Sequence, residues 1–157
     1  MSILVDVSIV KSIVQEALEK FYSNDIYLLE HDLHEQTISS KIACYLSIII
    51  ENKNLKYNVD VEYNRNGDAP KALIGSGNIR PDIIIHRRGK NNNTELDVNN
   101  LLIIEIKKWP NEEQRENDVE KIQEFIKDEN FRYLNGVFIS FKKEKDTFSH
   151  NIEWFSR

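Results

Sequence analysis

Two apolar segments decide the fold of this chain, RPDIIIH at residues 80–86 and LLIIEIK at residues 101–107. Each is a short, almost continuous apolar run, which is typical of a strand at the centre of a sheet. A carboxylate, Asp82, opens the first run, and Glu105 and Lys107 close the second. Burying an unpaired ion costs roughly several kcal/mol. Charged residues on such strands are therefore expected to bind a ligand or an ion.

The rest of the chain supplies helices and further strands. Apolar residues recur at helical spacing in three segments, which are predicted to be helices: residues 7–21, 33–51 and 113–127. Two more segments are predicted to be strands: residues 57–63, where polar and apolar residues alternate, and residues 136–141. Two polar stretches are predicted to be connections: residues 64–79 and 87–100. The tail, residues 147–155, fits either an edge strand or a short helix. This order predicts an α/β fold with a central mixed β-sheet flanked by helices.

The size and charge of the chain limit what it can be. Its 157 residues are expected to form one domain spanning residues 1–157, with a sizeable core. A formal net charge of −5 argues against a protein that grips nucleic acid by bulk positive charge. It does not exclude a nucleic-acid partner, because a metal site built from carboxylates is itself acidic and its bound cation offsets that charge.

Three features concern the compartment. No apolar run approaches the roughly 20 residues that a membrane helix needs, so no membrane partner is expected. The first residues lack the basic region of a signal peptide. The single cysteine, Cys44, cannot form an internal disulfide and is expected to be a small core residue beside the apolar stripe of its helix. We therefore expect a cytoplasmic protein.

The spacing of the charged residues brings them together. Side chains at positions i and i+2 of a strand lie about 6.5–7 Å apart on one face, so Glu105 and Lys107 share a face. If the strand after Asp82 pairs with theirs, the Asp82 carboxylate approaches Glu105. With the backbone carbonyl of Ile106, these groups form an oxygen-rich pocket suited to Mg²⁺ or Mn²⁺.

This set of groups suits phosphodiester hydrolysis. A bound Mg²⁺ polarises the scissile phosphate and lowers the pKa of a coordinated water. An ammonium group at Lys107 can position that water and offset developing negative charge. No set of cysteine and histidine ligands accompanies these residues, which disfavours zinc.

Pro81-Asp82, followed after an interval by Glu105-Ile106-Lys107, resembles the PD-(D/E)xK nuclease superfamily. The resemblance covers residues 32–141 and implies a restriction-endonuclease-like fold, with DNA as the expected substrate. It implies that Asp82 and Glu105 bind the metal and that Lys107 assists the attacking water. Many members carry a further glutamate on the helix before the sheet, and Glu35 is the best match here.

Each of these residues also has a purely structural interpretation. Asp82 could cap local amides at the start of a strand. Glu105 could form an ion pair with Lys107, or Lys107 could be the first solvated residue beyond its strand. Glu35 could be the third helical residue of a capping box whose cap is Asp32.

Other charged residues are given a structural role. Asp118 and Lys121 lie one turn apart on a predicted helix and are expected to form a surface pair. His31 and His34 are expected to be exposed to solvent. The main prediction is thus a metal-dependent nuclease. The alternative is a catalytically inactive binding or assembly module that works with a partner chain, and a homodimer is also compatible with the sequence.

Overall fold

The computed structural model describes residues 5–63, 80–90 and 98–157, and only the backbone of four two-residue strands between residues 65 and 78. The helices are α1 (Val7–Asp25), α2 (Tyr27–Glu30), α3 (Glu35–Asn52) and α4 (Glu112–Lys127). The strands of the main sheet are β1 (Asn58–Val61), β6 (Ile83–His86), β7 (Asn100–Lys108), β8 (Asn135–Glu144) and β9 (Thr147–Ser156). The short strands are β2 (Arg65–Asn66), β3 (Ala69–Pro70), β4 (Ala72–Leu73) and β5 (Gly77–Asn78).

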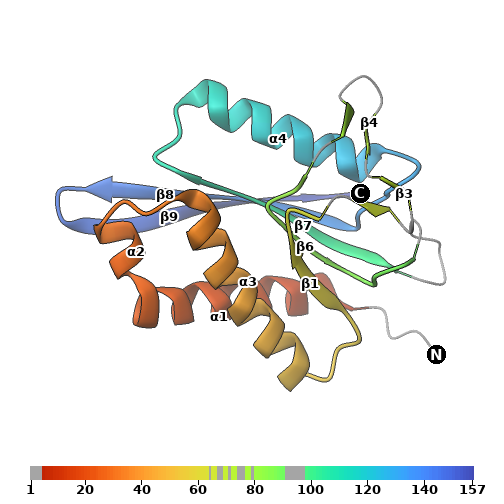
Figure 1. The fold of residues 1–157 in the computed structure, drawn as a ribbon, viewed down its shortest axis with the longest axis horizontal. Coiled ribbons are helices and arrows are strands. Elements are labelled where there is room, and N and C mark those ends of the chain that lie inside the picture. The colour runs from red at the N-terminus through yellow and green to blue at the C-terminus, as the bar shows by residue number, and fades with distance from the viewer. Residues whose placement is uncertain are drawn as a thin grey trace.

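The protein has an α/β fold in which a five-stranded mixed sheet lies between helices, as the sequence predicts (Figure 1). The strand order is β1-β6-β7-β8-β9. β7 and β8 are parallel and are connected through α4, while every other neighbouring pair in this sheet is antiparallel. The tail that sequence alone left open is the edge strand β9.

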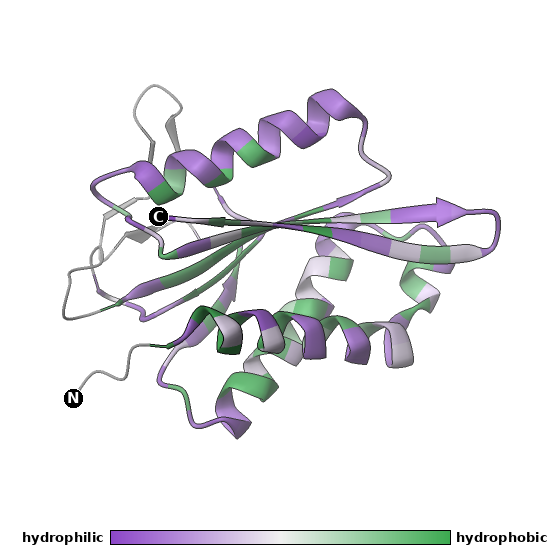
Figure 2. Cartoon of the chain, turned by 180° about the vertical axis from the view of Figure 1, so that it is seen from behind, coloured by the Kyte–Doolittle hydropathy of each residue, from purple (hydrophilic) through white to green (hydrophobic). Residues whose placement is uncertain are grey.

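Each face of the sheet packs against different helices. Ile83, Ile104 and Ile106 belong to the core beneath α1 and α3, whereas Ile84 and Ile103 belong to a second core beneath α4. Figure 2 shows the hydrophobic residues concentrated in the central strands, while α4 is largely hydrophilic with a narrow hydrophobic stripe. Because side chains alternate along β7, Glu105 and Lys107 face α4.

Tight packing holds α4 against the sheet. Asn111 caps the helix through a capping box with Gln114. Where the helix crosses β8, the backbone carries Gly136. A Cβ atom at this glycine would lie 2.3 Å from Cγ2 of Ile122 and 3.0 Å from Cδ1 of Ile126. The absence of a side chain at Gly136 therefore lets α4 approach the strands closely.

Several predicted details are wrong. α3 begins at Glu35, two residues later than predicted, because His34 is extended and Asp32 has a φ of +50°. No side chain caps this helix, so the capping box considered as the structural alternative for Glu35 is not formed. Cys44 is exposed, because neighbouring positions of α3, including Ala43 and Leu46, face the core instead.

Two predicted connections are only partly described. The segment predicted as loop at residues 64–79 contains β2–β5, which form two small antiparallel pairs. In the connection predicted at residues 87–100, residues 91–97 lie outside the described residues. Among the described residues, no helix combines the length and the apolar character needed to cross a membrane.

Candidate functional site

The end of β7 brings Asp82 beside the strand that carries Glu105. β6 and β7 are antiparallel, and their last paired residues at this end are Ile83 and Ile104. Asp82 precedes β6, and its Oδ2 accepts a hydrogen bond of 2.8 Å from the backbone N–H of Ile106. The carboxylate thus accepts the hydrogen bond that a further backbone carbonyl would accept if the β6–β7 pairing continued. Because the N–H and C=O of one strand residue point to the same edge, the Ile106 carbonyl also faces this edge.

Glu105 is buried beneath α4, with 2% of its surface exposed. Lys121 Nζ lies 2.8 Å from Glu105 Oε1, but its alignment leaves this oxygen without a true hydrogen bond. Burial raises the pKa of Glu105 well above its ordinary value, and repulsion from the Asp82 carboxylate adds to the rise. Lys121 offsets only part of this effect. The structural interpretation that pairs Glu105 with Lys107 is therefore not supported, since its ion pair is with Lys121.

Two further carboxyl groups share this environment. Burial raises the pKa of Asp82, although the Ile106 N–H and the Lys121 charge oppose the rise. Burial likewise raises the pKa of Asp118 on α4, against the opposing charges of Lys107 and Lys121. The Oδ2 atom of Asp118 is buried without a hydrogen-bond donor. Three carboxyl groups with raised pKa values in one place are typical of a functional site.

Lys107 lies between two of the acidic side chains. Its Nζ is 3.8 Å from Glu35 Oε1 and 3.8 Å from Asp118 Oδ2. Desolvation lowers the pKa of Lys107, but the charges of Asp118 and Glu35 outweigh this effect and the net shift is upward. The ammonium form therefore dominates at neutral pH. Lys107 is partly buried, with 31% of its side chain exposed, and is not a freely solvated residue.

Glu35 joins the site from the other side of the sheet. As the first residue of α3, it accepts a hydrogen bond of 2.7 Å from the backbone N–H of Lys108 through Oε2. Asp32, just before it, receives Lys108 Nζ at 2.5 Å and Trp109 Nε1 at 3.3 Å. These contacts fix the start of α3 to the end of β7. They leave Glu35 close to Lys107.

The prediction that Asp118 and Lys121 form a surface pair is wrong. Both point from α4 toward the end of β7, where Asp118 faces Lys107 and Lys121 contacts Glu105. The signal was present in the sequence, because Ile122 and Phe125 follow at the spacing of one helical face. Because Ile122 and Phe125 are buried against the sheet, Asp118 and Lys121 on the same helical face also point toward it. By contrast, His31 and His34 are exposed, as predicted.

The residues present fit a hard divalent cation. Asp82 and Glu105 supply carboxylate oxygens and Ile106 supplies a carbonyl, which are the donors that Mg²⁺ prefers. With Glu35 and Asp118, the cluster holds four carboxyl groups against the ammonium groups of two lysines, an excess of two negative charges when all are ionised. Among the described residues, no three or more side chains of His, Cys, Asp or Glu are grouped so as to hold a metal ion. A site with two carboxylates and a peptide oxygen is compatible with this finding, because Mg²⁺ usually keeps several waters.

Comparison of the chain with protein-family models, curated proteins and solved structures gives no match. The fold and the site therefore define a class by their physical features alone. It is an α/β protein with a five-stranded mixed sheet and a partly buried cluster of carboxylates and lysines at the end of a central strand.

Proposed function

We propose that this protein is a metal-dependent nuclease of the PD-(D/E)xK type that hydrolyses phosphodiester bonds in DNA. The observation that carries the proposal is the meeting of Asp82 with the strand of Glu105 and Lys107 in a buried acidic site. The order of the helices and main-sheet strands from α3 onward, α3-β1-β6-β7-α4-β8 with the short strands β2–β5 left out, supports it. Helix–strand–strand–strand–helix–strand is the order that the resemblance implies for a restriction-endonuclease-like core.

In this proposal Asp82, Glu105 and the Ile106 carbonyl hold Mg²⁺ or Mn²⁺. Such a metal, when bound, polarises the scissile phosphate and makes its coordinated water more acidic. The raised pKa values of Asp82 and Glu105 support this role, because burial removes both carboxyl groups from water and a bound cation would stabilise their charged forms.

Lys107 acts as a positively charged donor. An ammonium group has three N–H donors and no acceptor, so it orients a water or a phosphate oxygen but cannot take the proton that the water loses. Glu35 and Asp118, each 3.8 Å from Lys107 Nζ, hold it in place and keep it protonated. From its contacts, Glu35 positions Lys107, and a role as a further metal ligand remains part of the proposal.

Cleavage assays test this function. Plasmid, linear, single-stranded and branched DNA are incubated with Mg²⁺ or Mn²⁺ and either the wild type or Lys107→Ala. We expect metal-dependent cutting that falls by about 10²–10³-fold in the variant, the usual effect of removing one donor that stabilises developing charge. Lys41→Ala, at an exposed position on α3, is the control and keeps full activity. A folded, metal-loaded protein that cuts none of these substrates would refute the proposal.

One observation favours the alternative of a non-catalytic module that works with a partner chain. Lys121 already lies 2.8 Å from Glu105 and supplies part of the charge that a metal would bring. Calorimetry separates the two cases at the level of the metal. Binding of Mg²⁺ or Mn²⁺ that is lost in Asp82→Asn supports a metal site, whereas a wild type that binds neither ion supports the module. The cleavage assay separates an active nuclease from an inactive module that binds metal.

A further inference from the structure

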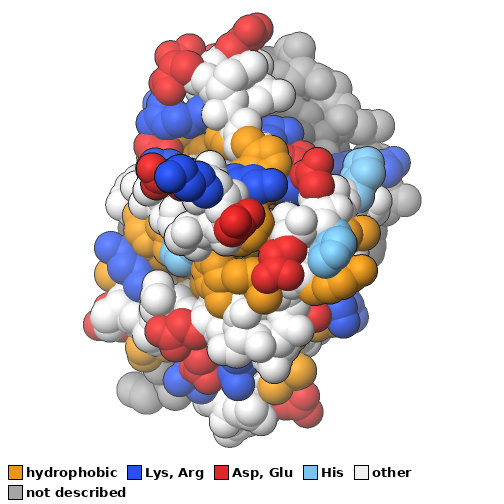
Figure 3. Space-filling view, turned by 90° about the vertical axis from the view of Figure 1, so that its left-hand side faces the viewer, with side chains coloured by type: hydrophobic (Ala, Val, Ile, Leu, Met, Phe, Trp, Pro, Cys, Tyr) orange, Lys and Arg blue, Asp and Glu red, His pale blue; other side chains and the backbone are white. Residues whose placement is uncertain are grey.

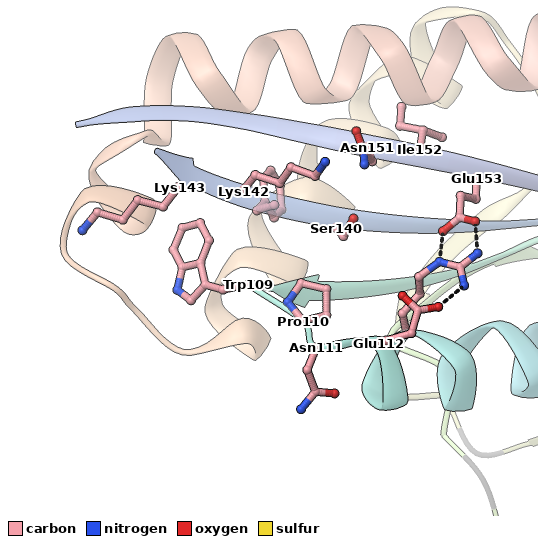
Figure 4. Close-up of a pocket in the computed structure, with 12 residues that line it drawn as sticks. Trp109, Pro110, Asn111, Glu112, Ser140, Lys142, Lys143, Asn151, Ile152 and Glu153 are labelled. Carbon is pink, nitrogen blue, oxygen red and sulfur yellow. Dashed lines mark hydrogen bonds and ion pairs between the residues drawn. The ribbon is translucent and has the colours of Figure 1, made fainter. Parts of the chain in front are cut away.

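A pocket opens beside the proposed active site. Its volume is about 820 Å³, and it is formed by the end of β7, the start of α4 and the β8–β9 hairpin (Figure 4). Ser140, in its wall, lies directly opposite Lys107 in the parallel β7–β8 pairing. The pocket therefore begins one strand away from the lysine of the site. Its volume lies within the roughly 300–1,000 Å³ of small-molecule sites.

The two ends of this pocket differ in charge. At one end, Arg115 forms ion pairs with Glu112 and Glu153, so its charge is compensated. At the other end lie Trp109, Lys142 and Lys143 (Figure 4). Both lysines are exposed, and neither forms an ion pair within the part of the chain that the structure describes. This end offers an aromatic ring and two exposed lysines. Lys143 lies over the Phe148 ring, and its charge helps to lower the pKa of Asp32.

Trp109 is held in an unusual backbone conformation. Its φ is +45°, in the left-handed region that bulky side chains rarely adopt. Its N–H donates to the Phe141 carbonyl at 3.0 Å, and its Nε1 donates to Asp32. The indole also packs against Phe148, with 6.0 Å between ring centroids. Backbone strain that the surroundings enforce tends to occur at functional positions, and here it places an aromatic ring at the mouth of the pocket.

We propose that this pocket binds an unstacked nucleotide next to the scissile phosphate, so that the substrate has a single-stranded segment at the cut. The base stacks on Trp109, and Lys142 and Lys143 contact the neighbouring phosphates. Bases of a duplex are stacked inside the helix, whereas a half-buried indole is reached only by a base that has been splayed out. The choice of nucleic acid as ligand rests on the proposed function.

The charge distribution agrees with a local contact of this kind. Figure 3 shows the end of the molecule where β8 turns into β9, with basic and acidic side chains interspersed and no uniform basic face. A protein with a net charge of −5 cannot hold a long duplex by bulk attraction. Stacking combined with two phosphate contacts needs only a small basic region.

The two tryptophans of the chain, Trp109 and Trp154, allow a direct test. Trp154→Phe leaves Trp109 as the only indole, and its fluorescence is followed in EDTA as oligomers of about ten nucleotides are added, a length within the usual site size. We expect quenching by oligo-dT or oligo-rU, and binding of the matched duplex at least about tenfold weaker. Comparing the two oligomers assigns DNA or RNA. Trp109→Phe keeps Trp154, which lies beneath Lys11 of α1, and shows no quenching.

A charge-reversal pair gives a second readout that does not depend on either tryptophan variant folding. In fluorescence anisotropy with labelled oligomers, Lys142→Glu/Lys143→Glu lowers affinity at least about tenfold and makes its salt dependence shallower, by about 0.7 in the logarithmic slope per lost phosphate contact. Lys41→Glu/Lys56→Glu changes the net charge equally at exposed positions outside the pocket and serves as the control.

The outcomes separate this inference from the nuclease proposal. Quenching of Trp109 by single strands without any cleavage supports the pocket and refutes only the nuclease. Cleavage of DNA without quenching of Trp109, or equal quenching by duplex and single strand, overturns the pocket while the nuclease stands. Equal loss of affinity in the two charge-reversal pairs also overturns it.

Discussion

At the scale of single residues, ionisation of buried Glu105 lowers the stability of the folded protein. It is almost fully buried, its pKa is raised, and one ammonium group, that of Lys121, lies against it. A carboxyl group with a raised pKa holds its proton more tightly in the folded chain than in the unfolded one. Its contribution to stability is thus complete below the unfolded-state pKa and is lost as the pH rises through the folded-state pKa.

This sign leads to a prediction for the metal-free protein. In EDTA, the free energy of unfolding of the wild type should fall as the pH rises above the ordinary Glu pKa of 4.5. Glu105→Gln removes one titrating group whose pKa is raised in the folded chain, so the decline of its free energy of unfolding with rising pH should be smaller than that of the wild type. Urea unfolding at several pH values measures both curves.

Glu120→Gln, at an exposed position of α4, is the control for this measurement and should follow the wild-type curve. Parallel curves for the wild type and Glu105→Gln would contradict the raised pKa. Asp82 and Asp118, whose pKa values are also raised, keep part of the pH dependence in the variant.

At the residue scale, the sequence predicts the strand charges better than the helical ones. Asp82, Glu105 and Lys107 could be found because charge in an apolar strand run has few structural explanations. Asp118 and Lys121 were missed because a charged pair one turn apart on a polar helix usually faces water. The opposing signal was their position on the same helical face as Ile122 and Phe125, which are buried against the sheet.

At the scale of elements, the distance between α4 and the sheet decides whether the site is complete. Gly136 on β8 provides the room for this close approach. Gly136→Ala should destabilise the protein by about 1–3 kcal/mol through overpacking against Ile122. It should also move Lys121 away from Glu105 and lower activity. Chemical denaturation and the cleavage assay measure the two effects.

A double-mutant cycle is the control for this prediction. Ile122→Ala removes the Cγ2 atom that a Cβ at Gly136 would meet at 2.3 Å. In that background, Gly136→Ala should cost less than in the wild type, because the clash is gone. Equal costs in both backgrounds would show that the glycine has another role.

The elements themselves could mostly be predicted, whereas their ends could not. Periodicity identifies the three long helices, because the apolar residues of each lie on one face. Continuous apolar runs identify the two central strands, because both faces of these strands are covered by a core. The start of α3 was predicted two residues early. The pattern of Asp32 followed by Glu35 favours a cap, but contacts of both residues with Lys108, far along the chain, fix the backbone differently. Local patterns carry no information about such partners.

At the scale of the whole molecule, metal binding should stabilise the fold. A ligand that binds only the folded chain adds about 2.7 kcal/mol to the free energy of unfolding at 100 times its dissociation constant. We expect Mg²⁺ or Mn²⁺ at neutral pH to raise the urea midpoint of the wild type and to leave that of Asp82→Asn unchanged. The same urea midpoints measured with Ca²⁺ and with K⁺ distinguish binding at a specific site from general screening of charge by salt. Equal shifts in wild type and variant would contradict a site at Asp82.

The site joins the start of α3 to a later part of the chain, which holds Asp82 just before β6, then β7 and α4. A chain that is still being synthesised exposes these elements one after another, with α4 last. Because β8 pairs in parallel with β7 and both strands pack against α4, we expect the carboxylates of β7 and α4 to come together only once β8 is present. We therefore expect a chain that stops before β8 to lack the packed cluster of carboxylates and lysines.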